Sequence, residues 1–91
     1  MYVMSAKLTF HIPYAVSLKD KRQVRRSLID KVRNHRFNVS IAEVDTWDIH
    51  RVLTIGIALV SGEADHAKDM LEEAIRYMEG HAAAELVEVG E

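Results

Sequence analysis

The fold is decided by one amphipathic stretch, residues 17–33, which has the sequence SLKDKRQVRRSLIDKVR. Ser17 is a suitable N-cap, because its hydroxyl can accept a hydrogen bond from a free amide of the first turn. Asp20 can complete a capping box and suits the positive end of the helix dipole, and Asn34 and His35 mark the exit. The spacing predicts a helix over residues 17–34 with one apolar stripe against the core: Leu18, Val24, Leu28, Ile29 and Val32.

This helix also carries most of the positive charge of the chain. Residues 19–36 hold eight of the twelve Lys and Arg residues and only two acids. From residue 43 onward twelve acids face three bases, so the total charge of −2 conceals a polarised molecule. At about 100° per residue, four basic residues share the sector beside the apolar stripe: Lys19, Arg22, Arg26 and Arg33. Lys21 and Arg25 fall inside the apolar sector, so we expect their stems on the core and their charged heads at its edge.

Length and composition bound the class of protein. The 91 residues suffice for a single domain, residues 1–91, with one core and no room for an internal cofactor, so we expect none. The chain has no run of about eighteen apolar residues, so the sequence predicts no membrane span. The first residues lack the basic region of a secretory signal. The absence of cysteine removes disulfide and thiol chemistry and fits a reducing compartment. These features favour a cytoplasmic protein with no membrane partner.

Alternating and helical patterns predict the remaining elements. Residues 3–12 alternate as a strand with one buried face, and residues 37–44 form a second strand. Residues 51–61 are apolar on both faces, which is typical of a central strand. A second helix follows Glu63, with acids in its first turn and Gly80 as the residue that ends it. A short last strand covers residues 85–89.

The order strand, helix, strand, strand, helix, strand predicts one architecture. Two right-handed crossovers and one hairpin give a four-stranded antiparallel sheet with two helices on one face. This is the ferredoxin-like α+β sandwich, βαββαβ. We expect the helices to cover the face made by Leu8, Phe10, Ile55 and Ile57, and to leave the opposite face bare in a monomer.

Three separated blocks carry a family resemblance. They are His11–Pro13, Ser17–Arg22 and Arg36–Val44, and they agree in order and spacing with the YlxP-like bacterial family of unknown function. The resemblance covers nearly the whole chain and implies the ferredoxin-like fold. Genes of this family often lie among those for transcription elongation, translation initiation and ribosome maturation factors, which implies a cytoplasmic role near RNA or the ribosome. The resemblance implies no activity and no catalytic residue.

The residues themselves offer no reaction chemistry. The chain lacks cysteine, a nucleophile-elbow glycine pattern and a phosphate-binding glycine loop. Acylphosphatases share the fold, but their glycine-rich phosphate loop is missing here, and a shared fold alone carries no function. Asp45, Asp48 and His50 could in principle hold a divalent cation, but their spacing matches no established motif and favours solvated loop polarity. We therefore predict a protein that is not an enzyme and holds no metal.

The charge pattern favours RNA or a ribosomal particle as the partner. Lys19, Arg22, Arg26 and Arg33 could meet successive phosphates, with Arg36 and Lys7 as flanks. The alternative is a solvated face that only keeps the protein soluble. Base stacking on the open sheet is disfavoured, because the outward positions of residues 3–12 and 51–61 supply no aromatic platform.

A second hypothesis is an interaction module. Four small or β-branched residues predict a flat apolar patch on the bare sheet face, suited to a homodimer packed sheet to sheet about a two-fold axis: Val52, Gly56, Ala58 and Val60. Trp47 and Tyr14 could anchor a protein partner, although Trp47 could equally cap the end of the core. Both hypotheses can hold together, because a dimer would present two basic helices.

Overall fold

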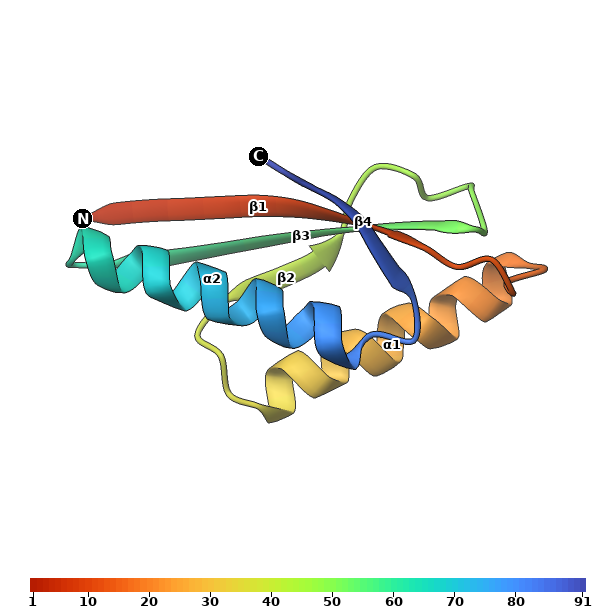
Figure 1. The fold of residues 1–91 in the computed structure, drawn as a ribbon, viewed down its shortest axis with the longest axis horizontal. Helices are drawn as coiled ribbons and strands as arrows, with labels where there is room; N and C mark the ends of the chain where they lie inside the picture. Colours follow the sequence, from red (N-terminus) through yellow and green to blue (C-terminus); the bar gives the residue numbers. More distant parts are fainter.

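The computed structural model describes residues 1–91 and has the predicted order of elements. Their bounds are β1 (Tyr2–His11), α1 (Leu18–Asn34), β2 (Ser40–Glu43), β3 (Val52–Ser61), α2 (Ala64–His81) and β4 (Glu85–Gly90). The strands form one sheet in the order β2-β3-β1-β4, with every neighbouring pair antiparallel. Both helices lie on the same side of this sheet (Figure 1). The ferredoxin-like α+β sandwich is therefore confirmed.

The core lies between the sheet and the two helices. Alternation along β1 and β3 sends every second side chain to the helix side, as period-two geometry requires. Leu8, Phe10, Ile55 and Ile57 are each no more than 2% exposed, which confirms the predicted buried face. The helices close it with Val24, Leu28 and Val32 from α1 and Ala67, Ala74 and Met78 from α2.

The start of α1 follows the predicted chemistry with one change. The hydroxyl of Ser17 accepts a hydrogen bond from the backbone amide of Asp20 at 3.3 Å. The Asp20 carboxylate accepts in turn from the amide of Val16 at 2.9 Å, one residue before the capping-box position. The helix ends at Asn34, as predicted, with His35 as the C-cap.

The prediction that Gly80 ends α2 is wrong. The helix continues through Gly80 to His81, and no glycine has a positive φ. The last turn is satisfied in another way, since Lys31 Nζ donates to the carbonyl oxygen of His81 at 2.9 Å. The His81 ring also stacks on Tyr77 with a centroid separation of 3.9 Å. A side chain of the neighbouring helix thus gives a hydrogen-bond donor to a carbonyl at this helix end, whereas a left-handed glycine motif would have given backbone donors.

The second strand is shorter than residues 37–44, because its first part packs instead of pairing. Phe37 contacts the rings of His35 and Tyr77, with centroids 4.6 Å and 5.3 Å away. Arg36 before it has a φ of 64°, a left-handed conformation that turns the chain away from α1. Pairing with β3 begins only at Ser40.

Two connections meet at the end of the sheet where α1 begins. The amide of Ile12 donates to the carbonyl oxygen of Arg51 at 2.8 Å, and Arg51 Nε donates to the carbonyl oxygen of Ala15 at 3.3 Å. The β1–α1 connection (residues 12–17) and the β2–β3 connection (residues 44–51) are therefore tied to each other. Neither helix combines the length and apolarity that crossing a membrane needs.

Candidate nucleic-acid interface

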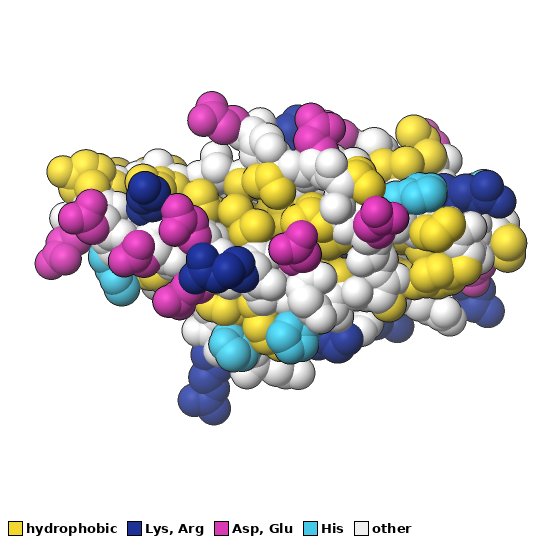
Figure 2. Space-filling model, in the orientation of Figure 1, with side chains coloured by type: hydrophobic (Ala, Val, Ile, Leu, Met, Phe, Trp, Pro, Cys, Tyr) yellow, Lys and Arg dark blue, Asp and Glu magenta, His cyan; other side chains and the backbone are white.

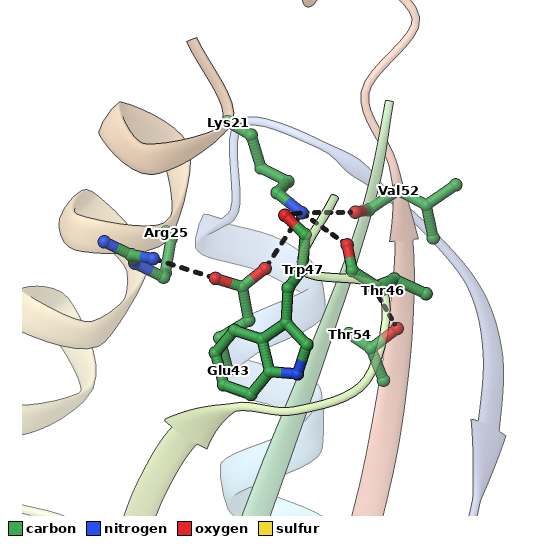
Figure 3. Close-up of polar contacts among 7 residues, drawn as sticks. All are labelled: Lys21, Arg25, Glu43, Thr46, Trp47, Val52 and Thr54. Atoms are coloured by element: carbon green, nitrogen blue, oxygen red, sulfur yellow. Dashed lines mark hydrogen bonds and ion pairs between the residues drawn. The ribbon is translucent and has the colours of Figure 1, made fainter. Parts of the chain in front are cut away.

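Lys21 lies inside the protein, and its charged head does not reach the surface. The residue is 1% exposed, so the expectation that its ammonium sits at the edge of the core is wrong. The β2–β3 connection turns two backbone carbonyls inward and the start of β3 a third, and Lys21 Nζ donates to all of them: Thr46 at 2.6 Å, Trp47 at 3.1 Å and Val52 at 3.3 Å (Figure 3). An ammonium has three hydrogens and no lone pair, so it suits a site made only of acceptors.

Glu43 completes this cluster from the end of β2. Its Oε2 lies 3.0 Å from Lys21 Nζ, and its Oε1 accepts from Arg25 Nη1 at 2.8 Å (Figure 3). The three hydrogens of the ammonium already point to carbonyls, so Oε2 is held by charge and lacks a well-aligned hydrogen bond. The Arg25 side chain is 29% exposed, so its head does reach the edge of the core. Both cations are engaged within the fold and are not free for a ligand.

Within residues 19–36, five other cations are exposed and make neither an ion pair nor a side-chain hydrogen bond, whereas Lys31 donates to the carbonyl oxygen of His81. We call these five cations the α1 basic face: Lys19, Arg22, Arg26, Arg33 and Arg36. The chain has three ion pairs within 4.0 Å, and none of them includes a member of this set. Arg33 lies fourteen positions after Lys19 along the helix, or about 21 Å at 1.5 Å per residue. Arg36 follows in the turn, where its amide donates to the carbonyl oxygen of Arg33 at 3.0 Å.

One acid interrupts the α1 basic face. Asp30 is exposed, four residues after Arg26 and three before Arg33, which places all three side chains on neighbouring positions of the helix surface. No ion pair within 4.0 Å forms between Asp30 and either arginine. The carboxylate therefore lowers the local positive potential without neutralising either guanidinium.

Lys7 does not flank the α1 basic face as predicted. It alternates with the buried Ala6 and Leu8, so it projects from the side of the sheet that the helices leave uncovered. There its Nζ donates to Asp45 Oδ2 at 2.8 Å. The hydrogen bond and the charge of Asp45 raise the pKa of Lys7 above its usual value. Asp45 is thereby engaged, and no three His, Asp or Glu side chains lie close enough together to hold a metal ion.

The open sheet face is partly covered by the β2–β3 connection. Thr46 Oγ1 and Thr54 Oγ1 share a hydrogen bond of 2.9 Å, and Thr54 is only 5% exposed. Gly56 leaves room for Val44, because a Cβ at that glycine would lie 3.2 Å from Val44 Cγ1. The expectation of a wholly bare face is therefore wrong.

The predicted sheet patch survives only in part. Val60 is 51% exposed, whereas Val52, Gly56 and Ala58 are half-buried. Gly56 and Ala58 line a hollow of about 340 Å³ between β1, β2 and β3. Trp47 lies in the connection whose backbone is bonded to α1, and the residue is 58% exposed, so its indole does not cap the core.

The neighbouring helix α2 is acidic. Figure 2 shows Asp and Glu side chains gathered over the first half of α2, at the left of the view. Apart from its histidines, α2 has two basic residues, Lys68 and Arg76. It has five acidic residues: Asp65, Asp69, Glu72, Glu73 and Glu79. The charge separation expected from the sequence thus places a basic α1 beside an acidic α2.

Comparisons with known proteins agree with the fold and with the family. Residues 3–90 match the model of a family described as "Protein of unknown function (DUF503)". Over 65 residues the chain is 34% identical to "Uncharacterized protein YlxP" of Bacillus subtilis (strain 168), covering 71% of this chain and 70% of that protein. A de novo designed protein with a ferredoxin fold, solved by solution NMR, superimposes with a TM-score of 0.59 at 14% identity, covering 96% of this chain and 82% of the designed one. The chain therefore belongs to the DUF503 family, and it is similar to YlxP.

Proposed function

We propose that this protein is a cytoplasmic, non-catalytic binding factor that contacts RNA, free or within a ribosomal particle, through the α1 basic face. The observation that carries the proposal is the absence of any carboxylate within 4.0 Å of these five cations. A cation already paired within its own chain must give up that partner to bind a phosphate. Lys19, Arg22 and Arg26 have no such partner to lose, unlike Lys21 and Arg25 on the same helix.

Length and polarity support the same partner. The helical part of the α1 basic face extends for about 21 Å, which is long enough to meet several successive phosphates of one strand. The acidic α2 would be repelled by phosphates, so the protein would approach RNA with α1 foremost. Opposed charges on two flanks thus favour one binding orientation.

The test compares two charge reversals of equal size. Arg22→Glu with Arg26→Glu reverses two charges of the α1 basic face. Lys68→Glu with Arg76→Glu reverses two charges on α2. All four of these side chains are exposed. Binding of a structured RNA with unpaired loops is followed by electrophoretic shift at about 50 mM salt. We expect the α1 variant to weaken binding at least about tenfold relative to the α2 variant. Equal affinities for the two variants, or no binding by the unaltered protein, would contradict the proposal.

A second candidate function is self-association through the open sheet face. Val3 and Val60 face each other across β1 and β3 and are 67% and 51% exposed, beside the hollow lined by Gly56 and Ala58. An apolar pair of this kind favours burial against a second copy. Light scattering at increasing concentration tests it: Val60→Lys would shift a dimer to a monomer, and a monomer at every concentration would refute it.

A further inference from the structure

Exposed apolar side chains gather at the end of the molecule where α1 begins. They come from the two connections that are tied together there: Tyr14 (58% exposed), Val16 (75%), Trp47 (58%) and Ile49 (51%). None of them belongs to the buried core or to the open sheet face. Tyr14 donates its hydroxyl to the carbonyl oxygen of Ala83, whereas the indole of Trp47 makes no hydrogen bond. An exposed indole beside a basic helix suits a partner with both aromatic and anionic groups.

Trp47 is fixed to α1 through its backbone. Its carbonyl oxygen accepts from Lys21 Nζ at 3.1 Å, and Lys21 immediately precedes Arg22 of the α1 basic face. Glu43 and Arg25 continue the same chain of contacts along the helix (Figure 3). The backbone that carries the indole is therefore held in place before any ligand arrives, which reduces the entropy lost on binding.

We propose that Trp47 stacks on an unpaired base of the RNA whose phosphates the α1 basic face contacts, so the ligand class is single-stranded RNA. This inference depends on the proposed function. A duplex has no free base face to offer a ring, whereas every unpaired base has one. Lys19 and Arg22 are exposed cations of the first turns of the helix that holds the Trp47 backbone, and Arg51 is an exposed cation of the same connection as Trp47. Asp48 is the exposed acid nearest to Trp47 in sequence. A protein partner would use the ring without needing these cations.

Trp47 is the only tryptophan of the chain, so its fluorescence reports on this contact directly. The probes are a short oligouridine and a fully paired, blunt-ended RNA duplex, called the stem, at about 50 mM salt. We expect the oligouridine to quench Trp47 emission and the stem to leave it nearly unchanged. Trp47→Ala keeps the backbone carbonyl that Lys21 binds, and it should weaken oligouridine binding at least about fivefold while stem affinity stays constant. Trp47→Phe should restore most of the loss.

The outcomes separate this inference from the proposed function. If Trp47→Ala leaves oligouridine affinity unchanged while Arg22→Glu with Arg26→Glu reduces it, stacking is refuted and the basic face stands. If neither RNA binds, the proposed function fails and the stacking fails with it. A blue shift of Trp47 emission with rising protein concentration alone would instead assign the ring to a protein contact. The quenching experiment on the unaltered protein holds even if Trp47→Ala fails to fold.

Discussion

Lys21 Nζ lies 3.0 Å from Glu43 Oε2, and the two side chains are 2% and 4% exposed. This contact joins α1 to the end of β2, and the remaining donors of Lys21 fix the β2–β3 connection to the same helix. The backbone of Trp47 is thus held against α1 by the same buried ammonium that pairs with Glu43. The proposed RNA surface therefore depends on a cluster that itself contacts no RNA.

Lys21→Met is expected to destabilise the protein strongly. It leaves the Glu43 carboxylate with Arg25 alone and takes the ammonium donor from three inward carbonyls, of which that of Thr46 still accepts from the amide of Ile49 at 3.2 Å. Removing one partner of a buried ion pair costs roughly 3–5 kcal/mol. Urea unfolding followed by circular dichroism measures the change. Lys19→Met, at an exposed and unpaired position, is the control and should change the unfolding free energy by less than about 0.5 kcal/mol. A loss below about 1 kcal/mol for Lys21→Met would contradict the structure of the cluster.

Arg25→Met should cost less than Lys21→Met. Arg25 is 29% exposed and makes one ion pair, and its loss leaves Glu43 with Lys21. We expect a loss on the order of 1 kcal/mol in the same urea experiment, near the upper end for a partly exposed pair. The opposite ranking of the two variants would mean that Arg25, and not Lys21, neutralises Glu43.

Asp30→Asn should strengthen RNA binding by about two- to threefold at low salt, because it removes the one acid between Arg26 and Arg33. Filter binding at about 50 mM salt gives the affinity, and the gain should shrink as salt screens the charge. Asp65→Asn on α2 makes the same charge change away from the α1 basic face and should have a smaller effect. Equal gains for both variants would indicate a net-charge effect with no defined surface.

Lys7 should titrate above its usual value of 10.5, because Asp45 stabilises the charged ammonium. A raised pKa in the folded state means that the pair stabilises the fold below the usual pKa and that this contribution is lost as pH rises through the folded pKa. NMR titration of the Lys7 side chain measures the value, and Asp45→Asn should lower it. An identical titration in both proteins would refute the pair.

Because Lys7 lies on the other side of the sheet, Lys7→Gln should leave RNA affinity nearly unchanged.

Regular patterns made the fold predictable. Leu8, Phe10, Ile55 and Ile57 share a face because side chains alternate along strands, and this rule needs no knowledge of distant contacts. Ser17 was predictable as a cap because its hydroxyl acts on an amide three residues away. The prediction from Gly80 was wrong, because the end of α2 is bonded to Lys31 of the other helix.

The buried cluster was harder to predict, because the acceptors of Lys21 are backbone carbonyls 25 to 31 residues away and leave no side-chain signal. One signal was available: Glu43 continues the inward parity of Phe37, Val39 and Ile41, so its carboxylate had to meet a buried cation. Lys21, in the apolar sector of α1, was the matching charge. The role of Lys7 could not be read in the same way, because its partner Asp45 lies in an irregular connection.

The salt dependence of RNA binding tests the central claim most directly. For about four to five phosphate contacts, the logarithm of the binding constant should fall with the logarithm of salt concentration with a slope near −3. Arg22→Gln with Arg26→Gln removes two contacts and should make that slope shallower by about 1.5. An unchanged slope in this variant, or binding that is independent of salt, would contradict an RNA surface built from the unpaired cations of α1.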